Sequence, residues 1–182
     1  MQTTLFMAMS LNGFIARTDG EEDFLSMAHW ADYVKLAHEH GNVIFGRKTF
    51  EAIMSWKDHN GFDDLIGVTK ILLSSDVTMD VPSDFYVMPS PQEAMEFLCE
   101  SGFENAFVCG GSMVNTAFLK QHLIHKIILN IEPILVGDGK RVFANDDFIE
   151  KLTFVSKQER SNGIVTLTYQ TPFKPYEHQH TH

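Results

Sequence analysis

The fold is decided by the stretch Asn42-Val43-Ile44-Phe45-Gly46-Arg47-Lys48-Thr49-Phe50. Its first four residues predict a short buried strand, which Gly46 ends, and a helix follows over residues 47–55. A strand that passes through a glycine into a helix is typical of open α/β sheets, in which ligands bind outside the carboxyl ends of the strands. The stretch therefore predicts both a fold class and the edge of the sheet where a site would lie.

The same alternation extends in both directions along the chain. Met27, Trp30, Val34 and Ala37 recur at helical spacing and indicate an amphipathic helix over residues 26–40. Further strands are expected at 4–9, 69–73, 85–88, 106–109 and 126–132, with helices at 91–102 and 112–121. Two last strands, 152–159 and 164–171, flank Ser161-Asn162-Gly163, a favoured hairpin turn. This order predicts a three-layer α/β domain: a mostly parallel central sheet, helices on both faces, and a C-terminal antiparallel hairpin.

Composition sets the class of protein. The 182 residues are 44% apolar and 21% charged, which is ordinary for a globular chain and excludes intrinsic disorder. We expect one domain over residues 1–174 and a disordered, histidine-rich tail over 175–182. The net charge of −10 argues against a nucleic-acid partner. No apolar run reaches membrane-spanning length and no secretory signal opens the chain, so a cytoplasmic protein is expected. Two cysteines, Cys99 and Cys109, make no disulfide framework, and no metal site is predicted.

Three strand ends carry residues suited to a nucleotide. Gly46 lets a ligand approach the backbone, and Arg47, Lys48 and Thr49 fall in the first turn of a helix, where free N–H groups attract anions. Gly110-Gly111-Ser112-Met113-Val114 repeats the glycine-to-helix pattern, and Ser74-Ser75 follows another buried strand. Each of these three segments also has an interpretation without a ligand. Arg47 and Lys48 can be a solvated basic pair, the two glycines can form a tight turn, and the serines can be polar residues that end a strand. Together they describe a cleft that matches a dinucleotide with an extra 2′-phosphate, so NADPH is expected over NADH.

These segments resemble the dihydrofolate reductase superfamily. Residues 45–53, Phe-Gly-Arg-Lys-Thr-Phe-Glu-Ala-Ile, are similar to its Gly-Arg-x-Thr-[Trp/Phe]-Glu-Ser-Ile segment, and 71–75 and 108–112 resemble two further cofactor segments in the same order. Two other stretches resemble the riboflavin-biosynthesis reductase branch, the C-terminal domain of the deaminase-reductase. They are Met9-Ser10-Leu11-Asn12-Gly13-Phe14-Ile15-Ala16 and residues 132–143, with their Gly137 and Gly139 spacing.

The resemblance implies NADPH-dependent hydride transfer to a pterin- or pyrimidine-type substrate, in the manner of 5-amino-6-(5-phosphoribosylamino)uracil reductase. By position, Ala8, Ile15 and Ala16 would line the nicotinamide. Arg47, Lys48 and Thr49 would hold the adenosine phosphate beside Gly46, Ser74 and Ser75 would flank the adenine, and Gly110 to Val114 would hold the pyrophosphate.

The substrate is then expected where residues 10–16, helix 26–40 and the end of strand 126–132 converge. Residues able to reach that space are Asn12, Trp30, Asp32, Val34, Phe50 and Asn130, a set poor in charge that suits a neutral heterocycle. Candidate proton donors, in falling order, are Asp32, Asp23 and Glu132. The alternative is a nucleotide-binding module without turnover. A homodimer is expected through region 133–171, where Ile134, Leu135 and Val136 adjoin the apolar hairpin.

Overall fold

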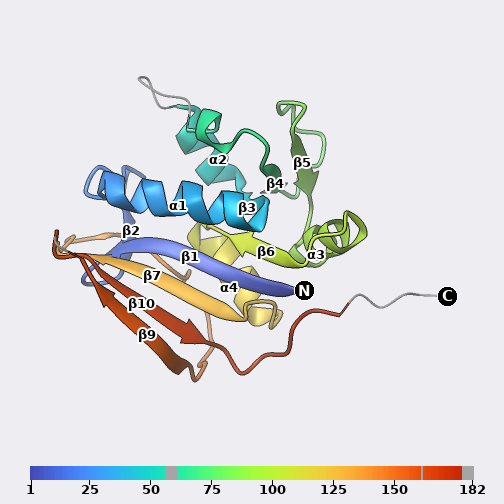
Figure 1. Cartoon of the computed structure of the whole chain (residues 1–182). Helices are drawn as coiled ribbons and strands as arrows, with labels where there is room; N and C mark the ends of the chain where they lie inside the picture. Colours follow the sequence, from blue (N-terminus) through green and yellow to red (C-terminus); the bar gives the residue numbers. More distant parts are fainter. Residues whose placement is uncertain (56–60, 161, 178–182) are drawn as a thin grey trace.

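The computed structural model describes residues 1–55, 61–160 and 162–177. An eight-stranded sheet crosses the molecule in the order β5-β4-β3-β6-β1-β7-β10-β9 (Figure 1). From β5 to β7 neighbouring strands are parallel, and β10 and β9 add an antiparallel hairpin at one edge. The strands are β1 (Gln2–Ser10), β3 (Asn42–Gly46), β4 (Thr69–Leu73), β5 (Phe85–Met88), β6 (Asn105–Val108), β7 (Lys126–Glu132), β9 (Thr153–Glu159) and β10 (Val165–Gln170).

Four α-helices in the described residues cover the sheet on both faces. They are α1 (Met27–His40), α2 (Arg47–Met54), α3 (Pro91–Glu100) and α4 (Ser112–Lys120), and a short helix, η1 (Asp63–Leu65), follows α2. Residues of α1 and α2 share one apolar cluster with Phe6 and Phe45, whereas α3 and α4 share another with Leu5 and Ile44. Adjacent strand residues therefore point into opposite cores, which confirms the predicted three-layer α/β class.

Local sequence explains where the helices begin and end. Ser90 accepts a hydrogen bond from the Glu93 amide, and Pro91 occupies the first turn, so α3 starts at the predicted residue. Helix α1 ends at Gly41, whose left-handed backbone (φ of 69°) suits a residue without a side chain. Within 133–150, which the sequence suggests is irregular, β8 (Gly139–Arg141) pairs with β2 (Phe14–Arg17) in a second, two-stranded sheet. Strand β8 is too short to give a period-two signal.

A sparse seam divides the large sheet between β3 and β6. The ladder of these two strands registers only Ile44 opposite Val108. The fully buried Asn42 adds side-chain bonds across it, donating to the Asn105 carbonyl at 2.7 Å and accepting from the Phe107 amide at 3.1 Å. From β3 the chain continues to β4 on one side of the seam, and from β6 it continues to β7 on the other side. Open α/β sheets bind ligands at the crevice where the connections diverge in this way.

The described part of the predicted tail lies against the N-terminus. The Tyr176 amide donates to the Met1 carbonyl at 2.9 Å, and the Met1 amine donates to the Tyr176 carbonyl at 2.5 Å. The boundary expected at residue 175 thus falls in a segment tied to β1, while residues 178–182 lie outside the described residues. Across the described ranges, no helix has both the length and the apolar content to cross a membrane.

Candidate functional site

A cavity of about 460 Å³ opens at the carboxyl ends of the central strands. Its floor includes Ala8 of β1 and Ile15 of β2, which are both buried. Thr49 of α2 and Gly111 before α4 line one part of it, and the segment 20–30 lines another. Of the residues predicted to meet the cofactor or substrate, Ala8, Ile15, Trp30, Thr49 and Gly111 therefore line one space.

The two glycine-led helix starts lie side by side. The Gly46 amide donates to the Gly110 carbonyl at 2.8 Å, and Gly46 and Gly111 are the N-cap residues of α2 and α4. Neither cap uses a side chain, so the first-turn amides of both helices stay free for an anion. A Cβ on Gly46 would lie 2.8 Å from a methyl of Val114, which explains why a glycine is required at this close approach.

Arg47 lies at the far side of the α2 start, near the loop after β4. Its guanidinium pairs with Glu51 one turn later at 3.0 Å, and both side chains are about half exposed. The Arg47 charge also helps to lower the pKa of Asp76, after the hydrogen bonds from Thr78. Because Gly46 registers opposite Leu73, Ser74 and Ser75 follow directly beside Arg47. Arg47, the exposed Lys48 and the two serines thus lie near one another at the ends of β3 and β4, and their role toward a cofactor stays a prediction.

The remaining predicted cofactor residues lie around α4 and β2. Ser112 donates its hydroxyl to the Arg141 carbonyl, which ties the α4 start to β8. Met113 is exposed and Val114 is buried behind Gly46. Ala16 is buried, and its carbonyl lies so close to Gly139 that a Cβ there would be 2.1 Å away.

Aromatic side chains form one wall of the cavity. The His29 ring stacks on Phe6 with centroids 5.3 Å apart, and Trp30 lies 4.9 Å from Tyr33. Burial lowers the pKa of the His29 imidazole to about 4 against a smaller opposing effect of Asp32, so the ring is neutral at pH 7. Burial likewise raises the pKa values of the Tyr33 phenol and the Cys109 thiol, which keeps both protonated. The wall is thus polarisable and uncharged.

An acidic loop lines part of the cavity. Glu21, Glu22 and Asp23 all line it, and Asp23 pairs with Arg17 at 2.7 Å. Crowding by the surrounding chain raises the pKa of the Glu22 carboxyl to about 7, although the Lys140 charge opposes this. A carboxyl group with a pKa near 7 beside a cavity is suited to donate or accept a proton.

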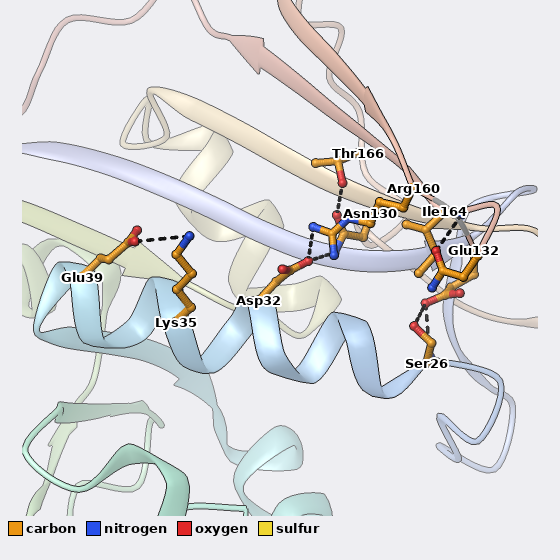
Figure 2. Close-up of polar contacts among 10 residues, drawn as sticks. Ser26, Asp32, Lys35, Glu39, Asn130, Glu132, Arg160, Ile164 and Thr166 are labelled. Carbon is orange, nitrogen blue, oxygen red and sulfur yellow. Dashed lines mark hydrogen bonds and ion pairs between the residues drawn. The ribbon is translucent and has the colours of Figure 1, made fainter.

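Asp32, the first-ranked proton donor from sequence, lies outside the cavity lining. Figure 2 shows its carboxylate pointing from α1 toward β7 and the hairpin. There it pairs with Arg160 at 2.6 Å and accepts a hydrogen bond from the Asn130 amide at 2.8 Å. Thr166 donates to the Asn130 carbonyl oxygen at 2.7 Å and completes the network. Trp30 and Asp32 are two residues apart on a helix, about 200° around its axis, so they cannot face the same space.

Three other predicted substrate residues also have structural partners. Asn12 donates to the Val136 carbonyl and accepts from the Val136 amide, which fastens the β1–β2 turn to the following loop. Phe50 packs among buried aromatic rings, and Val34 packs against the same core. Glu132, the third acid candidate, is buried and accepts from both the amide and the hydroxyl of Ser26 (Figure 2).

The residues missed by sequence reasoning are Glu22, His29 and Tyr33. The helical periodicity places His29 and Tyr33 one turn apart, on a common side of α1 with Trp30, and that signal could have found them. Glu22 sits in a charged loop with no periodic pattern, so only the folded arrangement places it at the cavity. The described residues contain no group of three or more histidine, cysteine or acidic side chains able to hold a metal ion.

The chain belongs to the RibD C-terminal domain family, which matches it over residues 2–166. This agrees with the fold: a mostly parallel sheet covered by helices, of the dihydrofolate reductase type, extended by an antiparallel hairpin.

Relatives cover nearly the whole chain. A Bacillus subtilis (strain 168) protein, "Uncharacterized protein YyaP", is 22% identical over 173 residues, covering 91% of this chain and 92% of its own. A putative riboflavin biosynthesis protein from Shewanella sp. PV-4 has a similar structure, with a TM-score of 0.74, 20% identity, and coverage of 94% and 99%. The Thermotoga maritima diaminohydroxyphosphoribosylaminopyrimidine deaminase/5-amino-6-(5-phosphoribosylamino)uracil reductase aligns with a TM-score of 0.71 and 16% identity. This chain covers 56% of it, and 93% of this chain is matched.

Proposed function

We propose that the protein is an NADPH-dependent reductase that transfers a hydride to a small planar heterocycle of the pterin or pyrimidine type. The observation that carries this proposal is the cavity beside two glycine-led helix starts that meet at the Gly46–Gly110 hydrogen bond. Membership in the RibD C-terminal domain family supports it, as does the reductase named in the Thermotoga relative.

The residues present fit a dinucleotide phosphate. Gly110 has a φ of 91°, and a Cβ there would lie 3.0 Å from the Met7 sulfur, so the chain keeps this approach free of side chains. The uncapped first turns of α2 and α4 would hold the pyrophosphate, and Arg47 and Lys48 would hold the 2′-phosphate. A bound NADPH supplies the hydride.

The chain's own residues then orient the reacting rings and supply the proton. Ala8 and Ile15 give a buried apolar floor against which a planar ring can lie, and Trp30 closes the opposite wall. The aromatic wall excludes water from that ring. Glu22 lines the cavity and has a pKa that allows it to be protonated near neutral pH, so we assign proton supply to its carboxyl group.

Cofactor choice tests the proposal. Arg47→Ala is expected to weaken NADPH binding about tenfold, a typical effect of losing one charge-assisted phosphate contact, and NADH binding less than about twofold. Calorimetric titration of both cofactors measures this, with Lys126→Ala, a remote exposed cation, as the matched control. Equal losses for the two cofactors would remove the 2′-phosphate role from Arg47.

Turnover separates the reductase from a nucleotide-binding module. Oxidation of NADPH is followed by absorbance across pterins, pyrimidines and quinones. Saturable NADPH binding without oxidation of NADPH by any of these compounds would favour the nucleotide-binding module. The observation that supports this alternative is that Asp32 is held in an ion pair with Arg160.

We also propose a homodimer formed through the C-terminal hairpin. Strand β9 is the outermost strand and is exposed along its whole length (Figure 1). Phe154 and Val155 on it are about half exposed, and Ile149 before it is almost fully exposed. A sheet edge with large apolar side chains is an association surface. Sedimentation of a 20.7 kDa species at micromolar concentration would refute the dimer. A cytoplasmic location stays a prediction.

A further inference from the structure

The charged side chains that line the cavity are of one sign. Glu21, Glu22 and Asp23 line it, and no lysine or arginine does so among the described residues. Two cations lie near this loop: Arg17, which is paired with Asp23, and Lys140, whose ammonium lies close to Gly20 and whose charge acts on Glu22. Three carboxylates therefore belong to the cavity lining itself, whereas these two cations do not.

The inner wall offers stacking and neutral hydrogen bonds. The His29 ring lines the cavity, and its Nδ1 is buried without a hydrogen-bond partner in the described part of the chain. A buried ring nitrogen without a partner has hydrogen-bonding capacity left for a ligand, because buried polar groups in folded proteins are otherwise paired. Phe6, Trp30 and Tyr33 beside it present ring faces and edges to a planar group.

We infer that the cavity takes an uncharged planar heterocycle that bears no phosphate, with His29 and the aromatic wall as its contacts and the acidic loop as the element that rejects phosphorylated analogues. This inference rests on the proposed function for the presence of a cofactor, and it narrows the substrate class. The proposed phosphate-binding groups, the first turns of α2 and α4, come from other elements than the acidic loop.

Matched ligand pairs test the inference. The probes are uridine with uridine 5′-monophosphate, and riboflavin with flavin mononucleotide, titrated calorimetrically into the full chain with NADPH present. The uncharged member of at least one pair is expected to bind at least about fivefold more tightly, since a phosphate would lie near like charges. The preference should shrink as salt is added, which a purely steric difference would not do. Equal binding, tighter binding of the phosphorylated members, or no binding of any probe would overturn the inference.

A charge-neutral variant supplies the second arm. At about pH 8.5, where a carboxyl group with a pKa near 7 is ionised, Glu22→Gln should raise the affinity of the phosphorylated members about two- to threefold. Glu100→Gln, the same change on the exposed surface of α3, should keep the wild-type ratio. An unchanged ratio in Glu22→Gln would also overturn the inference. NADPH alone is titrated in parallel. Absent NADPH binding with the ligand preference intact would refute the reductase, whereas intact NADPH binding without the preference would refute the ligand class.

Discussion

Replacing His29 by phenylalanine should remove a defined part of the protein's acid sensitivity. Burial holds the pKa of this imidazole near 4 in the folded chain, against 6.5 for an ordinary histidine. Between these two values the unfolded chain binds a proton that the folded chain does not, so the free energy of unfolding falls as the pH falls. The His29 contribution is complete above about pH 6.5 and is lost progressively toward about pH 4.

The size of the effect follows from the difference in pKa. At about pH 5 the pH lies roughly 1.5 units below the pKa of the unfolded imidazole, while the folded imidazole is still mostly neutral. This difference lowers the free energy of unfolding by about 2 kcal/mol. Because part of the ring lines the cavity and can be solvated, this value is an upper bound. Phenylalanine keeps the stacking on Phe6 and has no titratable group. The variant therefore loses the pH dependence of stability that His29 causes, without losing the ring contact.

Urea unfolding at about pH 7.5 and about pH 5 gives the free energy of unfolding for each protein. Wild type should lose up to about 2 kcal/mol more than His29→Phe over this interval, after contributions from all other groups cancel. His38→Phe, on the exposed side of the same helix, is the control. It shows how far replacing an exposed histidine by phenylalanine changes the pH dependence of the free energy of unfolding. If wild type and His29→Phe lose the same amount within about 0.5 kcal/mol, His29 is not buried in a neutral form.

Three further changes test other parts of the site. Gly110→Ala should destabilise more than Gly102→Ala in urea unfolding, by about 1 kcal/mol, because both have positive φ but only Gly110 has a neighbour at 3.0 Å; equal losses would mean that backbone strain alone matters. The rate of reduction should fall as pH rises through about 7 as Glu22 ionises, and Glu22→Gln should flatten that profile in steady-state kinetics; an identical profile would exclude Glu22 as the proton source. Asp32→Asn should cost about 1–3 kcal/mol of stability by leaving a half-buried guanidinium unpaired, and lost turnover with unchanged stability would instead support its predicted catalytic role.

The layered fold could be predicted because its signals are local. Glycines 46 and 110–111, helical spacing in 27–37 and the capped start at Ser90 each act through neighbouring residues, and all are found where the sequence places them. The convergence of the two glycine-led strand ends followed from parallel-sheet geometry alone.

The substrate side could not be predicted in the same way. Asp32 is expected beside the substrate because it belongs to helix 26–40, whereas its side chain is directed by Arg160, a partner more than a hundred residues away. Asn12 is expected beside the substrate because it belongs to segment 10–16, yet its side-chain amide donates to the Val136 carbonyl in a distant loop. The acidic loop over the cavity depends on how residues 17–26 pack on distant elements, for which the sequence carries no periodic signal.

The seam between β3 and β6 has a consequence for how ligands change the protein's motions. Helix α2 follows the strand on one side of the seam, and α4 follows the strand on the other. A ligand held by both helix starts would therefore add a link across a seam that is joined by Asn42, a few backbone bonds and the apolar clusters on the two faces. Opening of the seam would then require release of the ligand, so amide hydrogen exchange at Phe107 and Cys109 should slow in proportion to ligand saturation.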